Sequence, residues 1–208
     1  MILKCVSVKD VLDANSYFYI SEKTNHGFLI DPGAEANTLI NEIRNNNWVI
    51  EKILLTHGHF DHIGAVDQLF NVLNIPYFIH VNGAEYLLNA GYNLSMYFGR
   101  DIILKNANYF NDGDVLSIDD IHLQIISTPG HTTDSVVFYD ANSKITFVGD
   151  TIFRGSIGAT HFPGGDEKKL AKSIREKIFT LPEETVLYSG HSEKTDVRTE
   201  KRRYYITY

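Results

Sequence analysis

Residues 56–62 read Thr56-His57-Gly58-His59-Phe60-Asp61-His62 and are the most informative segment of the chain. They follow an apolar run, Ile53-Leu54-Leu55, which is typical of a buried strand, and the glycine at position 58 permits a sharp turn out of that strand. His57 and His59 are two residues apart, so on extended backbone they project to the same side. The segment therefore places two imidazoles together at a strand end.

Asp61 and His62 fall at the start of the next helical pattern, from which they can face the same space. A group of imidazoles with a carboxylate suits Zn(II), Fe(II) or Mn(II) better than Ca(II) or Mg(II). The simpler alternative is a metal-free turn in which Asp61 only caps the helix. Three imidazoles this close repel one another when protonated, which favours the metal site.

The composition of the chain limits the kinds of partner and the cellular compartment that we expect for it. A chain of 208 residues can form one sizeable core, and its net charge of −7 argues against a nonspecific nucleic-acid surface. The apolar runs are far shorter than a membrane span, so no membrane partner is expected. The single cysteine, Cys5, lies in an apolar run and is expected in the core; it cannot form an internal disulfide, which suits a reducing cytoplasm. Charged residues interrupt the N-terminal apolar run, so no signal peptide is expected and we expect a cytoplasmic protein.

Alternating and turn-bounded apolar segments predict a chain of strands and helices. Strands are expected at 1–8, 16–20, 27–30, 51–55, 76–80, 115–118, 122–127, 135–139, 145–148 and 185–188. Helices are expected at 35–46, after the histidine segment, at 83–88, at 167–179 with Asp166 as N-cap, and in the tail from 193. The stretch 89–111 reads as an aromatic-rich loop, which either borders a binding site or packs on the surface.

The order of these elements predicts the architecture. The first three strands predict an antiparallel meander, and both halves run from strands to helix with no linker between them. We therefore expect one domain over residues 1–208, of the α+β class, with two sheets packed face to face and helices outside.

Polar residues recur directly after the predicted strands, usually beside glycine. They are Asp31, His57 with His59, His131, Asp150 and His191. Strand ends at one edge of a sandwich can converge, so these side chains are candidates for a common site. The remaining histidines lack this context and are expected to be surface or structural residues: His26, His80, His122 and His161.

Five segments in this order resemble the metallo-β-lactamase superfamily, and within it the glyoxalase II-like branch. They are Asp31-Pro32-Gly33, residues 56–64, Thr128-Pro129-Gly130-His131-Thr132, Gly149-Asp150-Thr151 and Ser189-Gly190-His191. The resemblance implies an αββα sandwich of two mixed β-sheets with a metal pair at one edge. The implied metals are two divalent ions, with Zn(II) expected first and Fe or Mn as alternatives.

The resemblance also implies roles for individual residues. His57, His59 and His131 would hold the first metal ion. Asp61, His62 and His191 would hold the second, and Asp150 would bridge the two. Asp31 would orient the metal-binding loop by hydrogen bonds, in addition to forming the turn before Pro32. The implied chemistry is hydrolysis of a small-molecule thioester such as S-D-lactoylglutathione by a metal-bridged hydroxide, with Asp61 orienting the nucleophile.

The similarity is greatest to the short hydroxyacylglutathione hydrolase-like subgroup that lacks a C-terminal helical domain. Residues 149–158 and Phe162-Pro163-Gly164-Gly165-Asp166 resemble that subgroup's signature. Ala159 stands where the family usually places Arg or Lys, a candidate anchor for a glutathione carboxylate, and His161 replaces the usual Asp. Three other cations are candidates to supply the charge instead: Arg154, Arg198 and Lys201.

Other functions remain open on the sequence alone. A persulfide dioxygenase of the same superfamily would use a single iron held by the residues that match His57, His59, His131 and Asp150. A hydrolase of another ester or lactone, or a β-lactamase, is a second alternative, although the lactamases with a cysteine ligand are disfavoured because Cys5 is far from the motifs. A nuclease is disfavoured by the acidic charge. A monomer or a homodimer is expected.

Overall fold

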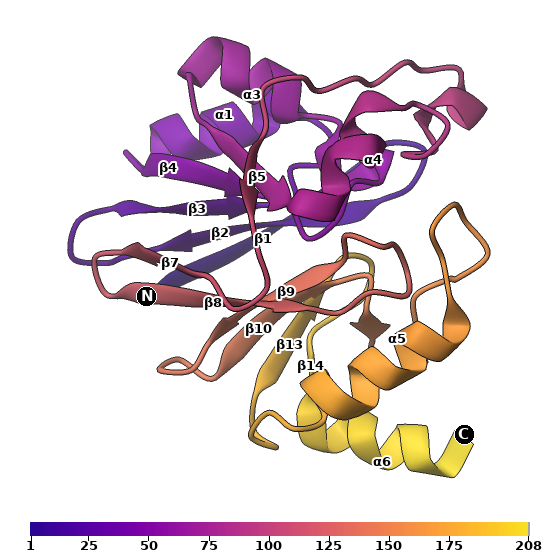
Figure 1. Cartoon of the computed structure of the whole chain (residues 1–208). Helices are drawn as coiled ribbons and strands as arrows, with labels where there is room; N and C mark the ends of the chain where they lie inside the picture. Colours follow the sequence, from indigo (N-terminus) through magenta and orange to yellow (C-terminus); the bar gives the residue numbers. More distant parts are fainter. Residues whose placement is uncertain (208) are drawn as a thin grey trace.

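The computed structural model describes the backbone of residues 1–207 and the side chains of residues 1–204. Two six-stranded sheets pack face to face, with helices on the outer face of each (Figure 1). The first sheet has the order β1-β2-β3-β4-β5-β6. Its strands are β1 (Ile2–Val8), β2 (Ala14–Ile20), β3 (His26–Ile30), β4 (Val49–Leu54), β5 (Tyr77–His80) and β6 (Asn108–Phe110). The expected antiparallel meander of β1, β2 and β3 is present, and β3 to β6 run parallel.

The second sheet has the order β14-β13-β10-β9-β8-β7. Its strands are β7 (Val115–Ile118), β8 (Ile121–Ser127), β9 (Val136–Asp140), β10 (Ile145–Gly149), β13 (Val186–Ser189) and β14 (Thr195–Asp196). Only β10 and β13 are parallel within it, so both sheets are mixed, as expected. A separate two-stranded ribbon is formed by β11 (Ile152–Phe153) and β12 (Ser156–Ile157).

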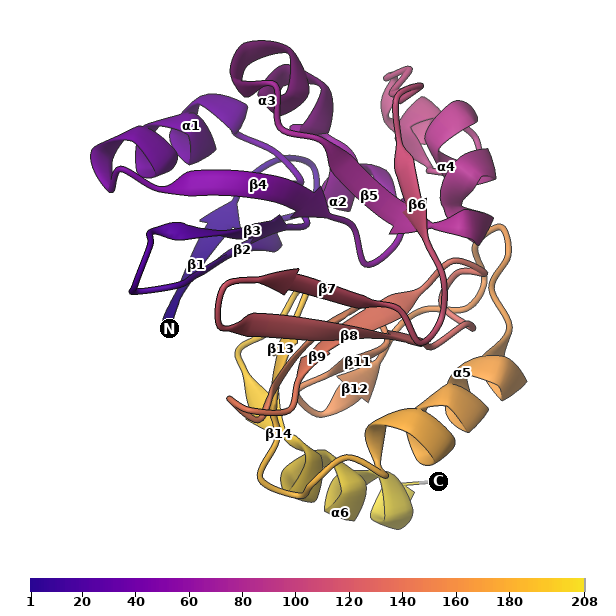
Figure 2. The ribbon, with the colours of Figure 1, turned by 60° about the vertical axis from the view of Figure 1, so that its left-hand side comes forward.

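The helices form the two outer layers (Figure 2). Those of the first half are α1 (Ala36–Asn45), α2 (Phe60–Ile63), α3 (Val66–Leu73), the 3-10 turns η1 (Val81–Gly83) and η2 (Ser95–Phe98), and α4 (Ala84–Leu88). Those of the second half are α5 (Glu167–Ser173), its π-helical continuation η3 (Ile174–Ile178), and α6 (Val197–Thr207). Asp166 caps α5 as expected, because its side chain accepts a hydrogen bond from the backbone N–H of Lys169.

Strand alternation explains how the layers hold together. In β2, Tyr17 and Tyr19 face the core between the sheets, where they meet Phe147. The intervening Phe18 and Ile20 belong to the core beneath α1 and α3. Both faces of the strand are buried, so a shift of one residue in register would exchange the two cores.

Strand direction also explains where the site lies. β3 and β4 are parallel, so Asp31 and Thr56 leave the first sheet at the same edge. β10 and β13 are also parallel, so Asp150 and His191 leave the second sheet at the same edge. The two edges are joined where the backbone N–H of Val136 donates to the carbonyl of Thr56 at 2.9 Å.

The structure corrects some expectations. Cys5 is exposed, because β1 is an edge strand of its sheet and has a neighbouring strand on one side only. The segment 89–111 contains η2 and β6, and the expected helix after the histidine segment is divided into α2 and α3. Within the part of the chain that is described, no helix is long and apolar enough to cross a bilayer.

Candidate metal centre

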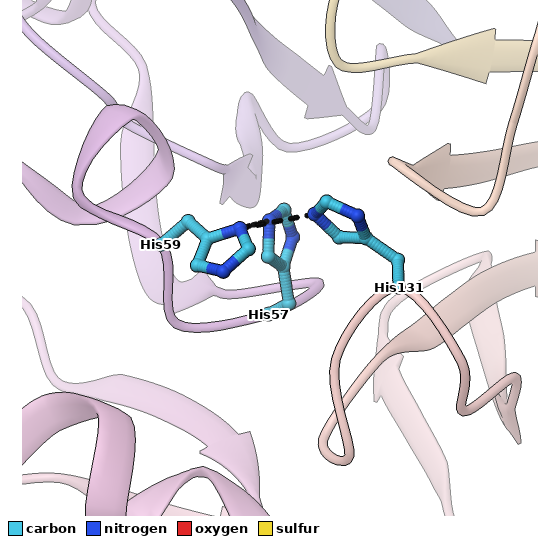
Figure 3. Close-up of side chains that lie close together, drawn as sticks. All are labelled: His57, His59 and His131. Atoms are coloured by element: carbon cyan, nitrogen blue, oxygen red, sulfur yellow. Dashed lines mark hydrogen bonds between the residues drawn. The ribbon is translucent and has the colours of Figure 1, made fainter. Parts of the chain in front are cut away.

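Three imidazoles from two different loops form the first group. His57 and His59 follow β4, and His131 comes from the loop after β8. The Nδ1 atom of His59 lies 3.2 Å from Nε2 of His57 and 3.0 Å from Nε2 of His131 (Figure 3). All three side chains are buried. The glycine before His131 is required, because it has φ of +140° and a Cβ there would lie 2.2 Å from the backbone nitrogen of Leu170.

The second group forms beside the first. Asp61 and His62 lie in α2, and His191 follows β13. The Nε2 atom of His191 lies 3.3 Å from Nε2 of His62 and 3.1 Å from Oδ2 of Asp61. A side chain at Gly190 would collide with Asp150 and His62, which explains the glycine before His191.

Asp150 lies between the two groups. Its Oδ2 atom is 3.6 Å from Nε2 of His131 and 3.3 Å from Nε2 of His191, and its Oδ1 atom is 3.4 Å from Nε2 of His62. Its carboxylate therefore contacts both sets of imidazoles at once. The structure thus gathers all seven residues that the resemblance named as ligands.

Hydrogen bonds fix which ring nitrogens face the centre. The Nδ1–H of His131 donates to the carbonyl of Ala159, and that of His191 donates to the carbonyl of Asp13, each at 2.7 Å. A carbonyl oxygen can only accept, so these bonds define the tautomer and leave the Nε2 lone pairs directed at the cluster. The Nδ1–H of His62 donates in the same way to Asp31 at 3.0 Å.

The donor atoms fit divalent cations. Tetrahedral ligands about 2.0–2.1 Å from one metal ion are roughly 3.3 Å from each other, which is close to the separations between the ring nitrogens. Oδ1 of Asp150 is buried without a hydrogen-bond partner in the described structure, and nitrogen lone pairs facing each other this closely are repulsive without a cation between them. Imidazole and carboxylate donors accommodate Zn, Fe or Mn.

The electrostatics of the two groups differ. Burial lowers the pKa of His57 well below its usual value and that of His59 to about 3, so both imidazoles are neutral, which is the ligating form. Burial also opposes protonation of His191, but hydrogen bonds to Asp150 and Asp61 outweigh it and raise its pKa to about 10. The carboxylate end of the site therefore attracts positive charge, which protons supply when no metal is bound.

Asp31 supports the loop that carries the ligands. It is buried, and its carboxylate accepts from the backbone N–H of Thr56 at 2.8 Å and from the Thr56 hydroxyl at 2.6 Å. Together with the bond from His62, these contacts tie the end of β3 to both parts of the histidine segment.

The three cationic candidates are not brought to the centre. Arg154 forms an ion pair with Glu193, and Arg198 forms one with Glu183 at 3.1 Å. Lys201 donates to the carbonyl of Phe179 at 3.2 Å. The last two belong to α6, on the outer face of the second sheet, and none of the three lines the cavity above the two histidine and aspartate groups. Their placement does not support the expectation that they replace the basic residue at position 159.

Comparison with known proteins assigns the chain to a family. Residues 10–191 match the family described as the metallo-beta-lactamase superfamily. The chain belongs to this superfamily. Relatives include the probable metallo-hydrolase YqgX of Bacillus subtilis, 40% identical over 91% of this chain and 90% of the relative. Hydroxyacylglutathione hydrolase GloC of Haemophilus influenzae is 34% identical over 84% of each chain.

Solved structures support the same assignment. The crystal structure of the BLEG-1 B3 metallo-beta-lactamase matches with a TM-score of 0.93 and 33% identity over the whole of both chains. TTHA1623 in a di-iron-bound form matches with a TM-score of 0.86 and 30% identity, covering 96% of this chain and 98% of that one. The expected fold and family are therefore confirmed, and the superfamily identifies the chain as a metallo-hydrolase homologue.

A cavity of about 700 Å³ opens above the ligands in this member of the superfamily. It is bordered by the segment 89–111, whose Leu94, Tyr97 and Phe98 line it, which favours the first of the two alternatives left open for this loop, that it borders a site. His161 also lines the cavity and contacts Phe162, with the ring centroids 4.1 Å apart and the ring planes tilted by 43°. The sequence placed His161 among the surface or structural histidines; it is exposed, but at the cavity.

The other three histidines without a strand-end context make local contacts away from the centre. His26 pairs with Glu51 at 2.7 Å, and His122 lies 2.9 Å from the hydroxyl of Ser117. His80 is buried and accepts from the backbone N–H of Asn82. Leu12, from the loop between β1 and β2, is a cavity residue that no motif in the sequence signals.

Proposed function

We propose that this chain is a dinuclear metal-dependent hydrolase that cleaves a small-molecule thioester. The observation that carries the proposal is the second ligand group, Asp61, His62 and His191, which is complete and shares Asp150 with the first. The relative named hydroxyacylglutathione hydrolase supports thioester chemistry. The di-iron-bound neighbour makes iron a candidate besides zinc.

The protein's own groups provide binding and orientation. When bound, divalent cations at such a site supply Lewis acidity and lower the pKa of a coordinated water from 15.7 to about 7. Asp150 contacts both ligand groups and so fixes their spacing. Burial alone would raise the pKa of Asp61, but His62 and His191 lower it, so this cavity-lining carboxylate is ionised and can accept a hydrogen bond from an attacking water.

A thioester suits this arrangement because its leaving group needs little help. Thiols have a pKa near 8.5, so a departing thiolate requires no strong acid, whereas an amine leaving group does. No serine or cysteine nucleophile is required. Neither metal-binding group includes Cys5.

The test is a titration of activity against bound metal. Protein reconstituted with zinc or with iron should hydrolyse a thioester, and His191→Ala should lose both the second metal ion and the hydrolysis. Oxygen uptake with one iron per chain and no hydrolysis would instead favour the dioxygenase. Hydrolysis of β-lactams but not thioesters would favour a lactamase, which the BLEG-1 likeness makes the second candidate.

A further inference from the structure

The wall of the cavity over the metal ligands is aromatic and aliphatic up to the ligands themselves. Phe162 packs against His59 with ring centroids 5.8 Å apart, and Phe153 packs against His191 at 6.0 Å. Further out, Phe98 packs against Phe60 at 4.7 Å. A group bound next to the reacting carbonyl therefore meets hydrocarbon on several sides.

Part of the apolar surface of this wall is exposed to solvent, and a bound ligand would cover it. Tyr97 is 67% exposed, Leu12 is 47% exposed and Phe98 is 42% exposed, and all three line the same cavity. They come from two segments that lie far apart in the sequence: the loop between β1 and β2, and η2. Covering such surface with an apolar group is favourable, and aromatic-lined cavities of this size are usual for small molecules.

Hydrogen bonds from His191 and His131 and one ion pair hold the wall in place. The carbonyl of Asp13, next to Leu12, accepts the hydrogen bond from His191, and Asp10 in the same loop forms an ion pair with Arg100 beyond η2. Ala159 is fixed similarly, since its carbonyl accepts from His131. The apolar lining therefore has a defined position relative to the reacting centre.

Among the described residues that line the cavity, none is a lysine or an arginine. The cations nearest in sequence to its walls have other partners: Arg100 pairs with Asp10, and Arg154 pairs with Glu193 in a separate groove behind His191. At position 159 there is only a methyl group. A carboxylate placed against the apolar part of these walls would lose hydration without gaining an ammonium or guanidinium partner.

From this lining we propose that the cavity takes a thioester whose group beside the scissile bond is an uncharged aromatic or bulky aliphatic one, rather than the doubly carboxylated glutathione moiety. The inference rests on the proposed hydrolase function and specifies its substrate class. Tyr97 and Phe98 provide the contacts that select the group, and Ala159, which lines the cavity, offers an anion no hydrogen-bond donor from its side chain.

The test compares two thioesters on the metal-loaded protein. S-phenylacetyl-N-acetylcysteamine carries no charge, and S-D-lactoylglutathione carries the two glutathione carboxylates. We expect kcat/KM to be at least about tenfold higher for the first. Phe98→Ala should lower kcat/KM for the aromatic substrate about tenfold, while Tyr109→Ala, which removes an aromatic residue 46% exposed outside the cavity, should not.

Ala159→Arg should raise kcat/KM for S-D-lactoylglutathione relative to the neutral substrate. Arg154→Ala should leave both rates unchanged; a selective loss of lactoylglutathione hydrolysis in that variant would overturn the inference, as would a wild-type preference for lactoylglutathione. A binding measurement separates this inference from the proposed function. Calorimetry with non-hydrolysable thioether analogues of the two substrates should show tighter binding of the neutral analogue even if neither thioester is cleaved, and tighter binding of the anionic analogue would overturn the inference.

Discussion

The Nδ1–H of His62 donates a hydrogen bond of 3.0 Å to the carboxylate of Asp31, although the two residues are 31 positions apart. The contact is buried and connects the end of β3 with α2. It fixes the orientation of the His62 ring, so that Nε2 points towards His191 and Asp150. Asp31, which binds no metal in our proposal, thus sets the ring orientation of His62, which does.

Asp31→Asn should weaken binding of the second metal ion by about 10–100-fold, because an amide has one acceptor oxygen where the carboxylate has two. The remaining acceptor cannot serve Thr56 and His62 together as in the wild type. Metal affinity measured by competition with a chelator checks this. Asp140→Asn is the matched control: it alters a buried carboxylate that accepts from Tyr19 and should leave metal affinity unchanged. Equal affinity in all three proteins would contradict this role of Asp31.

His59→Ala should abolish hydrolysis and leave the fold intact. Its Nδ1 lies near both other imidazoles of the first group, and the ring makes few hydrogen bonds that the fold requires. Turnover assays with circular dichroism check both parts. His122→Ala, which changes an exposed histidine of β8 whose ring contacts the hydroxyl of Ser117, should retain full activity. Wild-type turnover in His59→Ala would refute the metal assignment.

Gly130→Ala should destabilise the protein by roughly 2–4 kcal/mol and reduce metal binding, because the added Cβ clashes with Leu170 and the positive φ is strained. Displacement of the loop would move His131. Gly113→Ala is the control, since Gly113 also has positive φ, at +88°, but has nothing within 4 Å of the added Cβ. Gly113→Ala should lower the free energy of unfolding, measured with denaturant, by only about 1–2 kcal/mol, and its metal content should equal that of the wild type. Equal effects of the two substitutions would argue against the clash.

Asp134 should make the metal-free protein less stable as the pH rises. Asp134 is buried, and burial raises its pKa to about 7, although Thr132 and the backbone at Asp134 and Gly58 offset part of the increase. The unfolded chain ionises near pH 4, so between that pH and about 7 the folded state binds more protons and unfolding becomes easier.

Asp134→Asn removes this ionisation. In the presence of a chelator, the free energy of unfolding of the variant relative to wild type should increase by about 2 kcal/mol between pH 5 and pH 8. Urea titrations at several pH values measure the difference, in which the shared titration of the histidines cancels. A constant difference across this range would show that Asp134 is already ionised in the folded protein at pH 5.

The strand-end pattern was sufficient to predict the main features of the site. Asp31, His57, Asp150 and His191 each follow a strand, and the directions of β3, β4, β10 and β13 bring them to one edge. Periodicity could not reveal β11, β12 and β14, because each has only two residues. Their pairing depends on neighbours that local sequence does not specify.

The residues that line the walls of the cavity were less predictable from the sequence than the histidine and aspartate groups beneath it. Leu12 and His161 reach the cavity from loops whose paths depend on distant contacts, such as the bond between His191 and the carbonyl of Asp13. Cys5 was placed in the core because its neighbours are apolar, but the exposure of an edge strand is decided by the assembled sheet. Likewise, the ion pair between Arg154 and Glu193 joins residues 39 positions apart, which no local pattern indicates.

The dinuclear centre is tested most directly by the metal content per chain, measured by elemental analysis after reconstitution and combined with thioester turnover on the same sample. We expect about two divalent ions per chain in the active wild type and about one in an inactive His191→Ala variant. One ion per chain in fully active wild-type protein would contradict the dinuclear hydrolase.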